Sequence, residues 1–277
     1  MELISIHTGT FKLDGGAMFG VVPKALWSRK ITPDAFNRCT WAMRCMVVSE
    51  GDRLILIDTG LGDKQDEKFF SHFEPEGPGI EAALQAKGIA AKDITDVVLT
   101  HLHFDHSGGA IKRKGDLLVP TFPNATYWSN ETHWNWAMEP NMREKASFLK
   151  ENFSPLAEAG QLKFLADGES LIEGFKVHTF FGHTEAMILP HIQVKDKTLV
   201  YLADLQPSIH HFPIPWVMAY DVRPLVTIDE RAKFLQNAAD KDYLFFFEHD
   251  AENECCSLKQ TERGVSYSEL FELSNLK

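Results

Sequence analysis

Cysteine is scarce in this chain, and its scarcity excludes a disulfide-stabilised scaffold. The 277 residues include four cysteines, at Cys39, Cys45, Cys255 and Cys256. Four are too few for a disulfide framework in a chain of this length, and their spacing does not match a zinc ribbon. We therefore expect reduced thiols, and we assign the adjacent pair at 255–256 to packing rather than to redox chemistry.

The sequence also lacks an excess of basic residues and any long apolar run. Its 28 lysines and arginines against 39 aspartates and glutamates give a formal net charge of −11. Nucleic-acid phosphate needs a basic surface, so we expect no nucleic-acid partner. No apolar run approaches the length of a membrane span, and residues 1–4 do not open a signal peptide. We expect a cytoplasmic protein with no membrane partner.

The composition is otherwise that of a globular domain. Hydrophobic residues make up 44% and charged residues 24% of the chain, which leaves ample material for a core. We find no internal repeat and no low-complexity segment, and we expect one domain over residues 1–277.

The densest group of potential metal ligands lies in residues 100–109. It places three imidazoles and one carboxylate within six residues: His101, His103, Asp105 and His106. The apolar residues 97–99 predict a buried strand before the group, and residues 107–109 predict a turn after it. His101 and His103 are two positions apart, so they point the same way from extended backbone. Imidazoles with a carboxylate suit zinc, iron, nickel or copper better than magnesium or calcium.

Three further candidate ligands follow other predicted strands. Strands expected at 175–181, 198–203 and 244–247 end just before polar residues that can bind a metal: His183, Asp204 and His249. A lone histidine is more often a surface or core residue than a ligand. Because this chain also contains the group at residues 101–106, the position of each of these residues after a strand favours the ligand interpretation.

The pattern His101-x-His103-x-Asp105-His106 resembles the motif of the metallo-β-lactamase superfamily. The resemblance implies an α+β fold, a four-layer αββα sandwich with one or two metals between two sheets. Residues 13–24, and much of the chain up to about His249, resemble a branch of quorum-quenching N-acyl homoserine lactonases related to methyl parathion hydrolase. That branch implies a loop near the mouth of the active site at residues 13–24, and a homodimer.

The resemblance implies two metal sites joined by a bridging carboxylate: His101, His103 and His183 for the first, Asp105, His106 and His249 for the second, and Asp204 between them. Two divalent ions, which we expect to be zinc, can share a water and lower its pKa, and the resulting bridging hydroxide can attack a carbonyl. We expect Asp105 and Asp204 to take part in catalysis. Asp58 ends another predicted strand, and we expect it to orient a histidine or a backbone turn.

Two positions depart from the pattern of the resembled family. Ala186 stands where a glycine is usual. Pro207 stands where the lactonases have a tyrosine near the scissile carbonyl, so the hydrogen-bond donor to that carbonyl is unassigned. Four nearby residues are candidates: Ser208, His210, His211 and Tyr220. The apolar residues at 17–22 and 212–218 can line an acyl pocket or pack in the core, and the aromatic segment 128–138 can wall the pocket or anchor helices.

Lactone hydrolysis, with N-acyl homoserine lactones as the substrate class, is the function that the resemblance implies. His103 favours hydrolysis over redox chemistry, because the oxygen-reducing di-iron branch has a glutamate there. An organophosphate or aryl-ester hydrolase on the same site is the second hypothesis. A non-catalytic metal-binding module is the third, and the complete set of ligands argues against it.

Two local predictions concern helices near the site. Residues 129–153 predict two helical pieces that are interrupted at Pro140, with Asn141 capping the second piece and Glu144 three residues later. Residues 227–230 predict a capping box that opens a helix ending at about Ala239.

Overall fold

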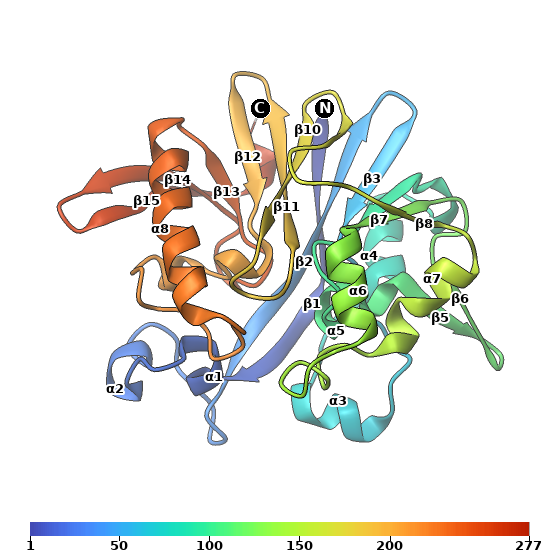
Figure 1. Cartoon of the computed structure of the whole chain (residues 1–277), viewed down its shortest axis with the longest axis horizontal. Helices are drawn as coiled ribbons and strands as arrows, with labels where there is room; N and C mark the ends of the chain where they lie inside the picture. The colour runs from blue at the N-terminus through green and yellow to red at the C-terminus, as the bar shows by residue number, and fades with distance from the viewer. Residues whose placement is uncertain (277) are drawn as a thin grey trace.

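Two mixed β-sheets face each other and carry helices on their outer sides. The computed structural model describes residues 1–276. The strand order is β1-β2-β3-β4-β7-β8 in the first sheet and β15-β14-β13-β12-β11-β10-β9 in the second. In Figure 1, α8 lies outside the second sheet, and α4, α6 and α7 lie on the opposite side of the molecule beside the first. These layers form the αββα sandwich, so the predicted fold class is confirmed.

The six strands of the first sheet are β1 (Glu2–Asp14), β2 (Arg38–Glu50), β3 (Arg53–Ile57), β4 (Asp96–Val98), β7 (Thr126–Ser129) and β8 (Leu162–Phe164). The seven of the second are β9 (Ser170–Ile172), β10 (Phe175–Phe180), β11 (Met187–Val194), β12 (Lys197–Tyr201), β13 (Leu244–Phe246), β14 (Cys255–Thr261) and β15 (Gly264–Phe271). A separate hairpin joins β5 (Ile111–Lys114) to β6 (Leu117–Pro120).

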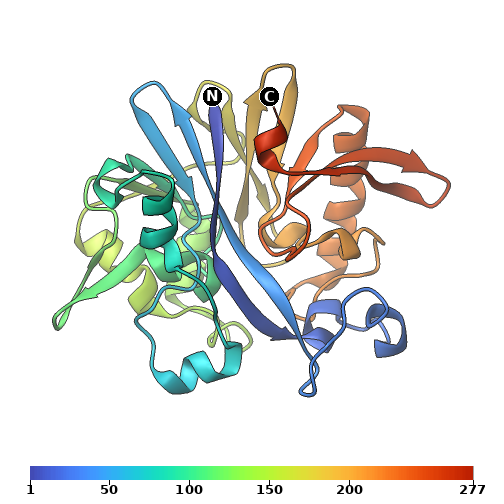
Figure 2. The ribbon, with the colours of Figure 1, turned by 180° about the vertical axis from the view of Figure 1, so that it is seen from behind.

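The helices are α1 (Gly15–Phe19), α2 (Lys24–Trp27), α3 (Glu67–Phe73), α4 (Gly79–Ala86), α5 (Phe104–Ser107), α6 (Glu131–Met138), α7 (Ser154–Glu158) and α8 (Pro224–Asp240). Short 3-10 helices are η1 (Ala91–Asp93), η2 (Gly108–Ala110), η3 (Lys150–Asn152), η4 (Ala203–Leu205), η5 (Ile209–His211) and η6 (Leu273–Asn275). The helices α1, α2 and α3 gather at the end of the sandwich away from both termini (Figures 1 and 2). In residues 1–276 we find no helix with the length and apolarity that a bilayer crossing requires.

Parallel strand pairs bring the ends of several strands together. β3 runs parallel to β4 in the first sheet, and β12 runs parallel to β13 in the second. The loops after β3 and β4 therefore leave from one edge, and so do the loops after β12 and β13. Each of these four loops carries one or more of the polar residues that the sequence predicts for the site: Asp58, His101 to His106, Asp204 and His249.

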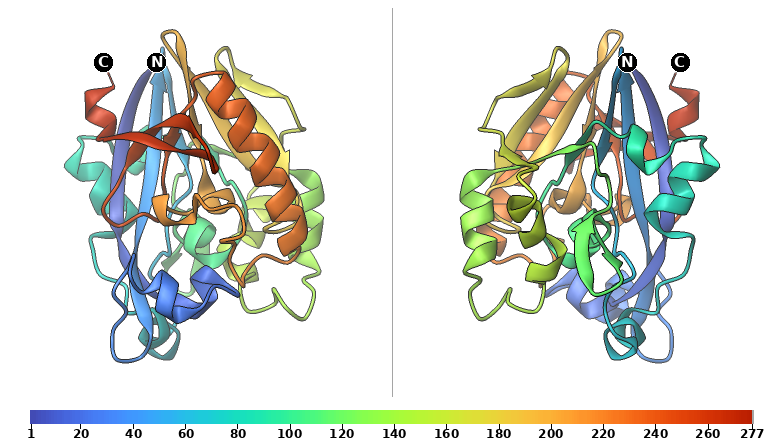
Figure 3. Two further views of the ribbon diagram at one scale, coloured as in Figure 1. Left: turned by 90° about the vertical axis from the view of Figure 1, so that its left-hand side faces the viewer. Right: turned by 90° about the vertical axis from the view of Figure 1, so that its right-hand side faces the viewer.

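The largest hydrophobic cluster fills the space between the sheets. Met46, Ile57 and Val98 of the first sheet share it with Leu189 and Phe246 of the second, and all five side chains are fully buried. Burying a large apolar side chain contributes about 1.5–3 kcal/mol, so this cluster fixes one sheet against the other. The hairpin of β14 and β15 lies beside α8 (Figure 3).

The prediction of a second helix after Pro140 is wrong. Residues 141–149 form turns that lead into η3. Asn141 does accept a hydrogen bond from the backbone N–H of Glu144, at 3.1 Å. The Glu144 carboxylate, however, turns into the protein and bonds to side chains there, instead of reaching back to the backbone N–H of residue 141 as a capping box requires.

The predicted start of the last long helix is also wrong. The helix α8 begins at Pro224, where the fixed φ of proline suits the first turn. Glu230 does not complete a capping box with Thr227. Its carboxylate instead accepts hydrogen bonds from the backbone N–H groups of Phe181 and Gly182, at 2.8 and 2.9 Å. Glu230 thereby fixes the loop that leads to His183.

Candidate metal centre

The loop after β4 presents the first four candidate ligands. His101 and His103 lie on its non-helical part, and Asp105 and His106 lie on α5. The expected turn at residues 107–109 is helical instead, and Gly108 has an ordinary helical φ of −59°. Its lack of a side chain serves close packing, because a Cβ there would clash with the Leu61 carbonyl. The loop therefore lies directly against the chain that follows β3.

The second sheet presents three further candidate ligands from the ends of its strands. His183 follows β10, Asp204 lies in η4 after β12, and His249 follows β13. The Asp204 carboxylate lies 3.0 Å from Nε2 of His183 and 3.1 Å from Nε2 of His249. It also lies 3.7 Å from His101 and 3.6 Å from His106, which belong to the first sheet. Asp204 therefore lies at the centre of the group.

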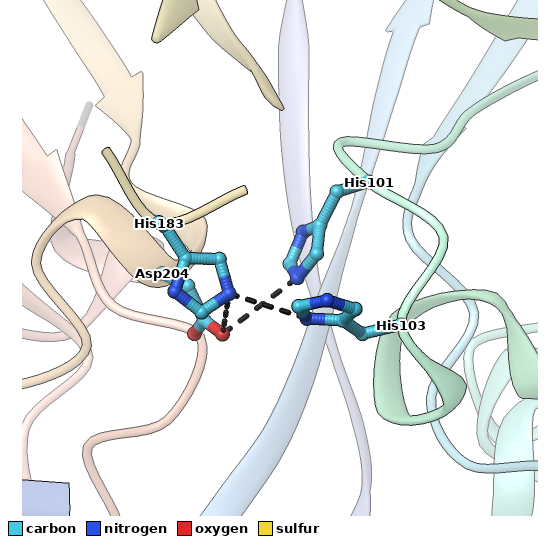
Figure 4. A group of neighbouring side chains, drawn as sticks. All are labelled: His101, His103, His183 and Asp204. Carbon is cyan, nitrogen blue, oxygen red and sulfur yellow. Dashed lines mark hydrogen bonds and ion pairs between the residues drawn. The ribbon is translucent and has the colours of Figure 1, made fainter. Parts of the chain in front are cut away.

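The seven predicted ligands divide into two sets in the structure. One set comprises His101, His103, His183 and Asp204, and the other comprises Asp105, His106 and His249. Figure 4 shows the first set, with His101 and His103 pointing across the space between the sheets toward His183 and Asp204. Within each set the ligand atoms all lie within 4.8 Å of one another. The resemblance implies the same division of the other six residues but puts Asp204 between the sets, and Asp204 does lie 3.6 Å from His106 and 3.1 Å from His249 of the second set.

The contacts within the sets fit a bound cation. Nδ1 of His103 and Nε2 of His183 face each other at 3.2 Å, and so do the Nε2 atoms of His106 and His249. Nε2 of His101 is fully buried and has no hydrogen-bond partner among the described residues. A buried polar atom without a partner is costly, and a metal ion between these nitrogens would supply the missing partner.

Each candidate histidine has a second polar group that fixes its ring. These pairs are His101 with Thr100 Oγ1, His103 with Glu144, His106 with Asp58, His183 with Asp221, and His249 with the Ala42 carbonyl, at 3.1, 3.4, 3.1, 2.9 and 2.8 Å. Such outer partners set the tautomer and orientation of metal-binding histidines. Asp58 also accepts from Thr100, through both its backbone and its hydroxyl. Its geometry matches the orienting role that we expected.

Charges in the group favour a cation. Burial opposes the charged forms, yet Asp204 and then Asp221 raise the pKa of His183 to about 10. Against the same effect of burial, Asp204 raises the pKa of His249 to about 9. In return, these two histidines and His106 hold the pKa of Asp204 well below its usual value despite its burial. The field around Asp204 therefore stabilises positive charge, which divalent ions supply on binding as they displace protons.

Several residues at the centre were not identified as site residues from the sequence. Asp221 and Glu144 hold histidine rings, and Glu248 is fully buried 3.1 Å from His106. Burial raises the pKa of the Glu248 carboxyl to about 8. Asp221 and Glu144 lie about forty positions from the histidines that they contact. The segment around Asp221 has no regular pattern, and the pattern around Glu144 indicated a helix cap instead. Glu248 had one signal, its position next to His249.

A pocket of about 210 Å³ opens onto the centre. Its polar floor includes His103, Asp105, His183, Asp204 and His249, and its apolar lining is Leu13, Met18, Phe104, Met218 and Ala219. Met18 and Met218 come from the two apolar loops that were expected either to line a pocket or to pack in the core. Most of their neighbours in those loops pack in the core, as Phe19 and Phe212 do. Each of the two loops thus contributes one residue to the pocket.

The two departures from the family pattern have structural consequences. Ala186 has a φ of +53°, in the left-handed region that favours glycine, which explains why glycine is usual there. Among the four candidates for the missing donor, Tyr220 lines the pocket. Ser208 and His211 are buried and pair with each other at 2.8 Å. His210 lines a different cavity.

Comparisons with known proteins agree with this architecture. The family model described as "Metallo-beta-lactamase superfamily" matches residues 44–249. A probable metal-dependent hydrolase from Staphylococcus aureus is 26% identical, with a TM-score of 0.89 and coverage of 98% of this chain and 96% of that one. AidC, a dizinc quorum-quenching lactonase in complex with a product, is 23% identical, with a TM-score of 0.81 and coverage of 98% and 95%.

A curated relative matches over a shorter stretch. The N-acyl homoserine lactonase AttM of Azorhizobium caulinodans is 30% identical over 78 residues, which span 28% of this chain and 26% of AttM. The family match, by contrast, runs from within β2 to His249 and includes all seven candidate ligands. Sequence, fold and the geometry of the centre agree, and the chain belongs to the metallo-β-lactamase superfamily of hydrolases.

Proposed function

We propose that this protein is a metal-dependent hydrolase that opens lactone rings, with N-acyl homoserine lactones as its substrate class and two zinc ions as its cofactors. The observation that carries the proposal is the pair of ligand sets around Asp204 at the floor of a pocket with apolar walls. Similarity to AidC and AttM, which are both described as lactonases, supports the choice of substrate.

The chemistry of ring opening assigns a task to each carboxylate. Two divalent ions would polarise the carbonyl oxygen of the substrate and lower the pKa of a water molecule. The water oxygen joins the carbonyl carbon, the bond from that carbon to the ring oxygen breaks, and the ring oxygen takes up a proton. Asp204 holds the two ligand sets together. Asp105, a member of the second set, also lines the pocket, where its carboxylate can carry that proton to the ring oxygen.

We propose that Tyr220 donates a hydrogen bond to the carbonyl oxygen. Its side chain is 37% exposed and lines the pocket with Asp105 and Asp204. Partial burial, and then these acidic neighbours, raise the pKa of the phenol, so it keeps its hydrogen at neutral pH. A donor aimed at the position where negative charge develops lowers the barrier of acyl transfer. Tyr220 thus takes the role that Pro207 leaves open, from a different loop.

We expect Tyr220→Phe to lower kcat for lactone opening on the order of 10²-fold, the lower end of the cost of removing one such donor. Because the contact forms with the developing oxyanion, KM should change little. Steady-state kinetics on one lactone give both constants. Tyr243→Phe, which removes a hydroxyl outside the pocket, is the matched control. Equal kinetics for the two variants would remove Tyr220 from the mechanism.

The pocket also predicts which acyl chains are preferred. Its volume of about 210 Å³ lies below the range of roughly 300–1,000 Å³ that is usual for sites of drug-sized ligands. The lactone ring and a short acyl chain fill such a space, and a long chain must extend beyond it. We therefore expect kcat/KM to be higher for short acyl chains than for long ones.

The test of the proposed function is a substrate panel on metal-loaded protein. Acyl homoserine lactones of increasing chain length are compared with paraoxon-type phosphotriesters and aryl esters, and ring opening is followed by proton release in a pH-stat. Metal-dependent opening of lactones supports the proposal. Turnover of phosphotriesters or aryl esters without lactone opening would replace it with the second hypothesis, and no turnover of any substrate would favour a binding role.

A further inference from the structure

Two buried side chains from one segment connect the two loops that carry the three histidines of the first ligand set. The segment is the stretch that contains α6 and the turns after it, and the side chains are His133 and Glu144. They are 0% and 2% exposed. One loop follows β4 of the first sheet and the other follows β10 of the second, so the ligands that they carry come from different layers of the fold.

His133 joins the two loops through its two ring nitrogens. Its Nε2 accepts a hydrogen bond from the backbone N–H of Leu102 at 2.8 Å, between the ligands His101 and His103. Because Nε2 accepts, Nδ1 carries the hydrogen, and it faces the backbone carbonyl of Glu185 at 2.5 Å. One neutral imidazole thus spans from the first ligand loop to a position two residues after His183.

Glu144 joins the same two loops through its carboxylate. Oε1 accepts from the Thr184 hydroxyl at 2.6 Å and from Nε2 of His103 at 3.4 Å. Oε2 accepts from the Trp136 indole at 2.7 Å and from the Asn141 amide at 2.6 Å. Four donors therefore fix the carboxylate: one from each of the two loops and two from its own segment.

The contact with Glu144 also sets the state of His103. A hydrogen on Nε2 of His103 leaves the lone pair on Nδ1, the atom that faces His183 at 3.2 Å. A carboxylate behind a ligating imidazole fixes its tautomer and raises its basicity as a ligand. Elsewhere the loops meet near the strand ends, where the Ile188 N–H bonds to the Thr100 carbonyl at 2.9 Å. His133 and Glu144 connect them close to the ligands themselves.

We propose that His133 and Glu144 are positioning residues for the three-histidine metal set: Glu144 acts through the ring of His103, and His133 acts through the spacing between the two ligand loops. This inference rests on the proposed metal-dependent function. The segment that carries α6 therefore determines how tightly, and in what geometry, the first ion is held. A purely structural role would instead change the free energy of unfolding and leave the metal site of the folded protein as it was.

The experiment measures metal binding directly on the full chain. Stripped protein is titrated with Co²⁺, and the affinity of each site and the visible d–d spectrum of the bound ion are recorded for the wild type, Glu144→Gln and His133→Gln. Glutamine at 144 removes the negative charge. Its side-chain N–H₂ group also faces groups that themselves donate hydrogen bonds to Glu144. Glutamine at 133 keeps an acceptor for the Leu102 N–H and shortens the reach to Glu185. Asn135→Ala and Lys145→Ala change exposed neighbours in the same segment and serve as controls.

We expect each test variant to lose about 10- to 100-fold in affinity at one of two sites, the usual cost of removing an outer partner of a metal ligand. We also expect an altered Co²⁺ spectrum, with the other site and both controls unchanged. Glu144→Asp keeps the charge, so it should recover part of the affinity, and it provides the measurement if Glu144→Gln does not fold.

Two other outcomes overturn the inference, and they are distinguishable. If the wild type binds two Co²⁺ ions and the folded variants bind them with unchanged affinities and spectra, the inference is wrong and the proposed function stands. If the wild type binds no metal, the proposed function fails and the inference fails with it.

Discussion

Asp204→Asn should abolish most of the hydrolytic activity, on the order of 10³-fold or more in kcat/KM, because it removes the carboxylate that contacts both ligand sets. The carboxylate touches histidines of both ligand sets, at 3.0 Å from His183 and 3.1 Å from His249. Asparagine has nearly the same shape, but it lacks the negative charge and turns an N–H₂ group toward imidazole nitrogens. Two cations would then repel each other without the carboxylate that compensates them.

Activity and metal content are measured together for this variant. Hydrolysis of the best lactone gives the rate, elemental analysis gives the ions bound per chain, and circular dichroism shows whether the protein is folded. Asp116→Asn, in the exposed turn between β5 and β6, is the control that changes the same group away from the centre. Unchanged hydrolysis by a folded Asp204→Asn protein would mean that the chemistry takes place elsewhere.

The candidate ligands could be predicted from the sequence because each one follows a strand. Short apolar runs identify buried strands, and a histidine or aspartate directly after such a run lies at a sheet edge. The two sheets then bring these edges together, so that Asp204 and His249 of one sheet meet His101 and His106 of the other. The resemblance to the family supplied the one piece of long-range information, which is that the edges of the two sheets face each other.

The residues that hold the ligands could not be predicted in the same way. Glu144 and Asp221 lie in turns and loops, where the side-chain direction depends on the whole fold rather than on a local period. Glu144 and Glu230 both suggested helix caps, and the structure uses both carboxylates to fix the loops around His183. The local sequence pattern predicted that these two carboxylates cap their own helices, whereas their hydrogen-bond partners lie far away in the chain.

The apolar loops show the same limit. Composition could not decide between a pocket and a core for residues 17–22, and the structure divides them. Met18 lines the pocket and Phe19 stacks on His211 with a ring separation of 4.8 Å. Neighbouring residues on a short helix point in different directions, so one loop serves both purposes.

Removal of divalent metal should abolish activity and also weaken the fold. Nε2 of His101 is buried and has no hydrogen-bond partner in residues 1–276, and two pairs of imidazole nitrogens face each other at 3.2 Å, so the folded chain offers a cation a set of contacts that the unfolded chain lacks. A cation that binds the folded chain and not the unfolded one adds about 4 kcal/mol to the free energy of unfolding when its concentration is 1,000 times Kd. We therefore expect chelator-treated protein to be inactive and to unfold at lower denaturant concentration.

Re-addition of single metals makes this prediction specific. Zinc, cobalt, manganese, nickel and iron(II) are added separately to stripped protein, and activity and the unfolding midpoint are followed for each. Activity and stability should return together, because the same nitrogens and carboxylates supply both. In Asp204→Asn the metal-dependent gain in stability should be smaller than in the wild type, since a shared ligand is lost. Full activity in stripped protein would contradict a metal-dependent reaction, and a gain of equal size in Asp204→Asn would place the stabilising ion outside the two ligand sets.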